Sequence, residues 1–238
     1  MKKITLLCVG LLLLIGCGRS LPVVKGEGQV LSKERKLLAY TQIRLECGAD
    51  IVLTHGQVGD ITINASQNME PYVITEVKNR VLIVRMSPDF AYQFTKKLEI
   101  CIPVDESLTE VTVQGSGDIT SHQQLQVKEL TCNVLGSGDI DLSLQAESLS
   151  FSVKGSGDIK IKGTTQTLGV AIAGSGDFDG DALQTKQANA SIRGSGDVDL
   201  FVTEQLSADI RGSGDITVKG NPKKIDVQTK GSGRVRYL

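Results

Sequence analysis

The four-residue motif Gly-Ser-Gly-Asp is the part of this chain whose residue types could do chemistry. It recurs six times, and a seventh copy that begins at Gly231 carries arginine in place of aspartate. Glycine-rich loops can bind phosphate, and rows of carboxylates can bind calcium. The aspartates of the six copies are Asp118, Asp139, Asp158, Asp177, Asp197 and Asp215.

The surroundings of the motif exclude a phosphate loop and leave two interpretations. A phosphate loop needs a Gly-Lys-Ser/Thr ending or a glycine-rich turn between a strand and a helix, and neither is present. We interpret the aspartates as a structural ladder whose oxygens accept backbone hydrogen bonds in Asx-turns, with the serines acting similarly in ST-turns. A calcium row is the alternative, although calcium β-rolls repeat every nine residues. Basic residues before later copies, such as Arg193 and Arg211, favour the structural ladder.

The spacing of the motif predicts the architecture. Successive copies start 18 to 21 residues apart, and every second residue around each copy is apolar. This is strand periodicity, and one short repeat cannot bury its apolar face alone. We therefore predict an all-β fold, a parallel β-helix or β-solenoid with corner repeats of about 19 residues, over residues 111–238.

The glycines and the two ends of the stack need their own explanation. The two glycines of each copy fall on the inward side, so we expect a tight corner that requires an absent side chain and access to positive φ. Ser and Asp then face outward. We expect the terminal Val235, Arg236, Tyr237 and Leu238 to cap the stack.

Residues 27–110 form a second β region without the motif. They alternate in polarity, and Gly48-Ala49-Asp50 resembles a degenerate corner, so this region either starts the same stacking or packs a small sheet against it. Phe90, Tyr92 and Phe94 share one strand face. We interpret them as hydrophobic cover, with a sugar-binding platform as the alternative.

The first residues read as a secretion signal. Residues 1–16 hold two lysines and an apolar run of signal-peptide length, and Leu14-Ile15-Gly16-Cys17 resembles the lipobox of bacterial lipoproteins. The resemblance implies cleavage before Cys17, lipidation of Cys17, and a linker over residues 17–26. Gly18 is not the aspartate that retains many lipoproteins at the inner membrane, so we expect an exported protein anchored in the cell envelope, at the outer membrane. A net charge of −1 for the whole chain gives no reason to expect a nucleic-acid partner.

The remaining reactive residues do not form a recognisable catalytic set. Cys47, Cys101 and Cys132 have no metal-ligand spacing, and we favour buried apolar thiols over a Cys47–Cys101 disulfide. His55 and His122 are the only histidines, and each lies in a polar, turn-like stretch. We predict a protein that is not an enzyme and that has no cofactor.

The order of these segments resembles a known family. A lipoprotein signal, then "VKGEGQVLSKERKLLAYTQIRLECGADIVLTHG", then "VTVQGSGDIT" with serial copies of the motif, is similar to the bacterial family described as putative auto-transporter adhesin, head GIN domain. The resemblance implies a β-helical, exported and often lipid-anchored protein. It provides no catalytic residue to transfer.

We therefore expect a non-enzymatic binding or adhesion module of the cell envelope for a glycan or protein ligand. The outward residues that could bind such a ligand include Thr131, Asn133, Ser150, Ser152, Asn189 and Ser191. One alternative is an envelope assembly protein that docks partners by strand pairing. Another is a β-helical enzyme that acts on polysaccharides. The sequence leaves the oligomeric state open.

Overall fold

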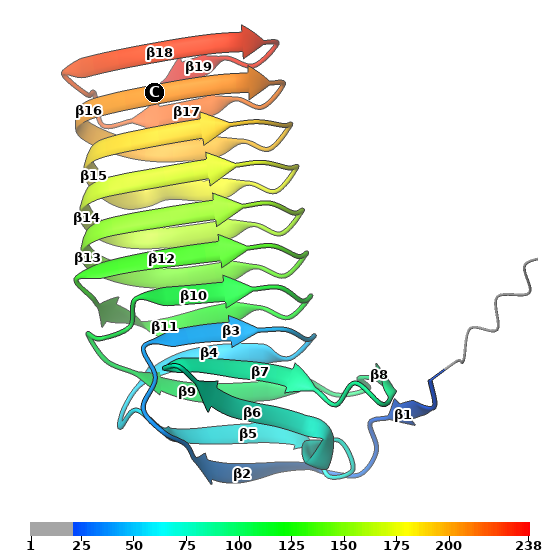
Figure 1. Ribbon diagram of the computed structural model, residues 1–238. Coiled ribbons are helices and arrows are strands. Elements are labelled where there is room, and N and C mark those ends of the chain that lie inside the picture. The colour runs from blue at the N-terminus through cyan, green and yellow to red at the C-terminus, as the bar shows by residue number, and fades with distance from the viewer. Residues whose placement is uncertain (1–20) are drawn as a thin grey trace, which may run out of the picture.

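The computed structural model describes residues 21–238, which form a β-solenoid (Figure 1). The predicted signal peptide and Cys17 lie outside the described residues. The strands of the N-terminal half are β1 (Val23–Lys25), β2 (Val30–Lys36), β3 (Gln42–Leu45), β4 (Asp50–His55), β5 (Asp60–Ser66), β6 (Val73–Lys78), β7 (Val81–Met86), β8 (Ala91–Gln93) and β9 (Glu99–Val104). A 3-10 helix, η1 (Glu70–Tyr72), precedes β6. No helix in residues 21–238 has the length and apolar character needed to cross a membrane.

The C-terminal half is a regular stack of parallel rungs. Its strands are β10 (Glu110–Val113), β11 (Ile119–Gln126), β12 (Glu129–Val134), β13 (Ile140–Val153), β14 (Ile159–Ile172), β15 (Phe178–Ile192), β16 (Val198–Gly212), β17 (Ile216–Lys219), β18 (Lys224–Gly231) and β19 (Val235–Tyr237). Each rung has one strand before the Gly-Ser-Gly-Asp corner and one after it. Strands β13 to β16 bend at the rear edge, opposite the corner, and so contribute to both sheets. The predicted all-β solenoid is confirmed.

The core lies between the two sheets and is built from the predicted apolar columns. The residues four places after the first glycine of each copy are almost fully buried from Ile119 to Ile216. The column two residues before the glycine is equally buried from Val113 to Ile210. Phe178 is the largest residue of the first column. Gly180 makes room for its ring, because a Cβ there would lie 2.5 Å from Phe178 Cε1.

The N-terminal half extends the same stack in a non-sequential order. Strands β3 and β4 form a rung that pairs in parallel with β10 and β11. On their other side, β3 pairs with β7 and β4 with β9, so the chain returns through a rung below β3–β4 before it crosses to β10 (Figure 1). Strands β2, β5 and β6 then add antiparallel. Both arrangements considered for residues 27–110, continued stacking and an added small sheet, are present.

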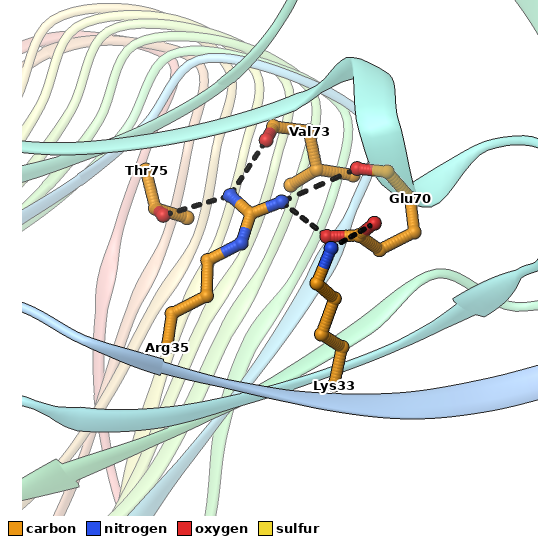
Figure 2. Close-up of polar contacts among 5 residues, drawn as sticks. All are labelled: Lys33, Arg35, Glu70, Val73 and Thr75. Carbon is orange, nitrogen blue, oxygen red and sulfur yellow. Dashed lines mark hydrogen bonds and ion pairs between the residues drawn. The ribbon is translucent and has the colours of Figure 1, made fainter.

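The antiparallel strands close this end of the solenoid, and a polar network holds them together (Figure 2). The Arg35 guanidinium on β2 donates to the backbone oxygens of Val73 and Glu70, to Thr75 Oγ1 and to the Glu70 carboxylate. Lys33 Nζ lies 2.9 Å from the other Glu70 oxygen. Glu70 is buried. Burial raises the pKa of its carboxyl, but hydrogen bonds from Arg35 and Lys33 outweigh this effect and hold the pKa below its usual range.

The opposite end of the stack has no such cover in the part of the chain that the structure describes. Val235–Tyr237 is a regular strand, β19, that continues the sheet beside β17. The prediction that these residues cap the stack is wrong, because they extend the ladder by one more strand. All eight residues of β18 are exposed, including Ile225 and Val227, whose columns are buried in the preceding rungs.

Candidate binding surfaces

The repeated aspartates form one continuous hydrogen-bonded ladder along the corner. Oδ1 of each aspartate accepts a hydrogen bond from the backbone N–H of its counterpart in the next rung. The N···O distances are 2.7–2.9 Å from Asp139 to Arg234. Asp50 starts the ladder by accepting from the N–H of Asp118 at 3.2 Å, so Gly48-Ala49-Asp50 does act as a corner. These bonds join different rungs, in contrast to the Asx-turns expected within a single rung.

The serines of the corner have a different role from the one expected. Their backbone N–H groups donate to the carbonyl of the first glycine one rung earlier, for example from Ser156 to Gly136 at 3.2 Å. Within residues 21–238 their hydroxyls accept no hydrogen bond from a neighbouring backbone. The predicted ST-turns are therefore absent there, and the exposed hydroxyls line the corner.

Close stacking of backbones is the reason for the corner glycines. A Cβ on Gly157 would lie 2.2 Å from the carbonyl oxygen of Gly138 in the rung below, and the other copies show similar contacts. Among the corner glycines only Gly194 and Gly231 have positive φ, at 157° and 142°. The expectation that every corner glycine needs a positive φ is wrong. Glycine is required because a Cβ at these positions would collide with the backbone of the neighbouring rung.

The charges beside the ladder do not form a metal-binding cluster. No group of three or more His, Cys, Asp or Glu side chains in residues 21–238 has an arrangement that could hold a metal ion. A shallow hollow of about 360 Å³ is nevertheless lined by Asp158, Asp177, Asp179, Asp197 and Asp199. Lys160 lies 2.8 Å from Asp179 within it and offsets part of the charge.

The outward residues predicted for ligand binding lie on the sheet that precedes the corner. Thr131, Ser150, Gly169, Asn189 and Ser207 form one column, in register from strand to strand. Residues of this face line a shallow trough of about 340 Å³. Asn133, however, already donates to Glu110 Oε1 at 3.1 Å and to Thr112. This face offers small polar groups but little depth.

A larger groove runs along the rear edge, opposite the corner. Its volume is about 800 Å³, and it crosses three successive rungs. The side chains of Gln126, Gln145 and Gln166 line it, together with Glu106, Lys128 and Glu147. Gln126 and Gln145 are direct register partners in neighbouring rungs. In the described part of the chain, none of these three amides is hydrogen-bonded to another residue, so their donors and acceptors face solvent. Sequence reasoning did not find this groove.

A second groove of about 520 Å³ adjoins the first and shares Glu106 and Gln126 with it. His55, at the end of β4, lines this part, and its Nε2 lies 3.2 Å from the carbonyl oxygen of Gln124. His122 is exposed on β11 and does not line either groove. The two histidines thus belong to strands and not to the turns that the sequence suggested.

The aromatic residues form a cluster at the N-terminal end. The ring centroids of Phe90 and Tyr92 lie 5.0 Å and 5.8 Å from that of Tyr72. The hydroxyl of Tyr92 donates to the Ser87 carbonyl. Phe94 lies apart from this cluster, beside Gly48, and is partly exposed. The rings pack on one another, which fits hydrophobic cover better than a flat platform.

The cysteines in the described residues are all free thiols. Cys132 is fully buried in a core column, and burial raises its pKa far above the ordinary value. Burial also raises the pKa of Cys47 and of Cys101. Thiols protonated in this way are poor nucleophiles, so the structure agrees with the apolar interpretation and lacks the Cys47–Cys101 disulfide.

The corner ladder and the two-sheet rungs define a class of β-solenoid proteins. The family described as putative auto-transporter adhesin, head GIN domain, matches residues 39–222. The chain belongs to this family, as its motifs suggested. Membership fits an exported, surface-associated protein.

Solved structures show the same fold. A putative adhesin from Bacteroides fragilis superposes with a TM-score of 0.83 at 24% identity and covers 90% of this chain and 100% of its own. A putative adhesin from Parabacteroides distasonis gives 0.71 at 24% identity, covering 91% and 100%. A putative lipid binding protein from the same species gives 0.73 at 24% identity, covering 91% and 99%. Among curated proteins none matches the chain.

Proposed function

We propose that this protein is a lipid-anchored, non-enzymatic adhesion module of the cell envelope and that it binds a glycan along the rear-edge groove. The observation that carries the proposal is the row of Gln126, Gln145 and Gln166 in a groove of about 800 Å³. Each amide offers an acceptor oxygen and two N–H donors, the groups that pair with sugar hydroxyls. Gln126 and Gln145 are register partners in rungs about 4.8 Å apart, and Gln166 lies in the following rung, two residues beyond Thr164, the register partner of Gln145.

The setting of the groove supports binding over catalysis. It is open along its length and is lined by a repeated residue type, whereas a catalytic site gathers unlike groups with a nucleophile, an acid and a base. The carboxylates Glu106 and Glu147 add acceptors at its margin, and Lys128 adds a donor between them. The solenoid holds all of these groups on strands, so little ordering is needed when a ligand binds.

Glycan binding is tested with an array of neutral and acidic oligosaccharides, using the mature chain in which Cys17→Ser replaces the lipidated residue. We expect retention of a subset of glycans and an affinity at least about tenfold lower for Gln145→Ala, which corresponds to the loss of about 1.4 kcal/mol. Gln187→Ala is the matched control, because Gln187 is an exposed glutamine on β15 that does not line the groove. Equal retention by both variants would place the ligand elsewhere. Shortening of a retained glycan during incubation would instead indicate an enzyme.

The membrane anchor is tested separately. We propose that Cys17 carries the lipid and that the protein resides at the outer membrane, from the lipobox resemblance and from Gly18. In cells fed labelled palmitate, the wild-type chain should take up label and fractionate with the outer membrane, and Cys17→Ser should do neither. Label retained in Cys17→Ser would contradict the assignment.

A further inference from the structure

The C-terminal end of the solenoid has two open strand edges. Strand β18 pairs with β16 from Lys224 to Gly231, and β19 pairs with β17. Neither strand pairs with a further strand on its other side in residues 21–238. Their outer N–H and C=O groups therefore continue the hydrogen-bonding pattern of each sheet without a neighbour. Such edges are templates for pairing with another chain.

Apolar side chains that belong to the core lie open at this end. Ile225 is 50% exposed and Val227 is 37% exposed, whereas Leu206 and Ala208, their register partners on β16, are at most 3% exposed. Tyr237 on β19 is 50% exposed. A further rung above these residues would bury them, as each rung in the stack buries the one before it.

The other end of the solenoid has edges of a different kind, because β2 pairs only with β5 and β6 only with β7, both antiparallel, so these strands have a free side but do not form an open parallel rung. There the antiparallel strands β2, β5 and β6 cover the stack, and Arg35 fixes them to Glu70 (Figure 2). Head-to-tail stacking of copies would require an open parallel rung at that end. Only two C-terminal ends can meet as open rungs, and such a contact closes with two-fold symmetry.

The charges on β18 are self-complementary in one antiparallel register. If β18 meets β18 of a second copy with Gln228 opposite Gln228, then Asp226 of each copy lies opposite Lys230 of the other. Val227 then lies opposite Thr229 on the inward face. Neither Asp226 nor Lys230 takes part in an ion pair in the described residues. Lysine on an open edge usually opposes pairing, but here each Lys230 meets a carboxylate.

We infer that the C-terminal edges of β18 and β19 bind a second copy of this chain, end to end, in the register that opposes Asp226 and Lys230. A two-fold axis perpendicular to the sheets brings β18 against β18 and β19 against β19 at the same time. Both sheets then run on through the contact, and Ile225, Val227 and Tyr237 are enclosed between the copies. This inference is independent of the proposed glycan groove, which lies at the rear edge several rungs away.

The test is a disulfide between two copies in cells that express the full-length protein. Residues directly opposite in an antiparallel pair have Cα atoms about 4.5–5.5 Å apart, which a disulfide can bridge. We expect Gln228→Cys to migrate at twice the monomer mass on a non-reducing gel and at the monomer mass after reduction. Asn189→Cys is the control, because Asn189 is exposed on the same sheet but within β15. A Gln228→Cys chain that stays monomeric like the control overturns the inference, as does a cross-link at any other mass.

Charge reversal distinguishes the register from chance proximity. In the Gln228→Cys background, Asp226→Lys should lower the dimer fraction several-fold, because two lysines then face each other at each position. Adding Lys230→Asp should restore the dimer fraction, since the pairs are opposite in charge again. A dimer that is indifferent to Asp226→Lys overturns the proposed register.

Discussion

The backbone N–H of Asp158 lies 2.7 Å from Oδ1 of Asp139, the equivalent residue one rung earlier. Asp158 in turn accepts from the N–H of Asp177 at 2.8 Å. Each aspartate is thus a link between two rungs, and this explains why the residue recurs with the corner. The ladder leads to predictions about stability that separate its structural role from ion binding.

Loss of one link should destabilise the stack. We expect Asp158→Ala to lower the free energy of unfolding by about 1.5–3 kcal/mol, because the N–H of Asp177 loses a charged acceptor. Asp158→Asn should cost less, since its amide oxygen can still accept. Chemical denaturation measures both. Asp141→Ala is the control, because Asp141 is exposed and accepts no hydrogen bond in the described structure. Equal losses in Asp158→Ala and Asp141→Ala would contradict the ladder.

Calcium should not change the stability of the protein. Each ladder carboxylate already has one oxygen bound to a backbone N–H, and the described residues hold no metal-binding cluster. We expect the same midpoint of thermal unfolding, followed by circular dichroism, in calcium and in EDTA. A ligand that binds only the folded state must raise the midpoint, so a large rise in calcium would show that the aspartate row is an ion site.

Corner glycines should not tolerate alanine. In Gly157→Ala the new methyl would lie 2.2 Å from the Gly138 carbonyl oxygen, so the two rungs must separate. We expect a loss of more than about 2 kcal/mol or failure to fold. Gly169→Ala is the matched control, because its nearest atom is Ser150 Oγ at 3.8 Å. Thermal unfolding of the control should match or exceed wild type, and a comparable loss in both variants would refute the close-contact explanation.

High pH should weaken the fold through Tyr40. Burial is the main reason that the pKa of Tyr40 is raised from 10.0 to about 12, and its hydroxyl donates to the Pro103 carbonyl at 2.7 Å. Since only the unfolded state ionises readily, this stability is complete below pH 10 and is lost as the pH rises through 12. We expect a loss of about 2–3 kcal/mol over that window in denaturant titrations. Tyr40→Phe should remove the part of this loss that Tyr40 contributes and leave the part contributed by the buried thiols such as Cys132, whereas Tyr237→Phe, at an exposed tyrosine, should retain the whole dependence.

Low pH should weaken the closed end through Glu70. Its pKa is depressed, so its contribution is present above its ordinary value of 4.5 and is lost as the pH falls through the lowered folded value. We expect Glu70→Gln to be less stable than wild type at pH 7 and to lose less stability on acidification. Glu34→Gln, at an exposed carboxylate on β2 without an ion pair in the described residues, serves as the control in thermal unfolding. If the two variants responded alike to acid, the network would not stabilise the fold.

The sequence predicted the repeat unit well because the unit is local. The alternation of apolar residues correctly predicted which side chains point inward, for example those of Val113 and Ile119. The resemblance of Gly48-Ala49-Asp50 to the motif correctly identified the first corner. The reason for the corner glycines could not be read in this way, because it depends on the distance between rungs. The order of the N-terminal rungs was also hidden, since β3 pairs with two strands distant in sequence.

The groove escaped prediction for a related reason. Its residues come from the loop before β10 and from three successive rungs, and only stacking brings them together. The first repeat carries extra residues that shift the register between Thr120 and Gln124. Gln126 and Gln145 therefore fall at different offsets from their glycines and do not align as a column in the sequence. An alignment anchored on the preceding buried residues, Leu125 and Leu144, pairs Gln126 with Gln145 but places Thr164, not Gln166, in the next rung.

The aspartate ladder also makes the length of the molecule adjustable. Every internal rung accepts from the next and donates to the previous one in the same way, so a duplicated repeat meets neighbours that already fit it. Each such duplication in a gene would move the C-terminal edge about 4.8 Å farther from the closed end. The number of repeats encoded in the gene thus sets the distance between the closed end and the open C-terminal edge, and neither end has to change.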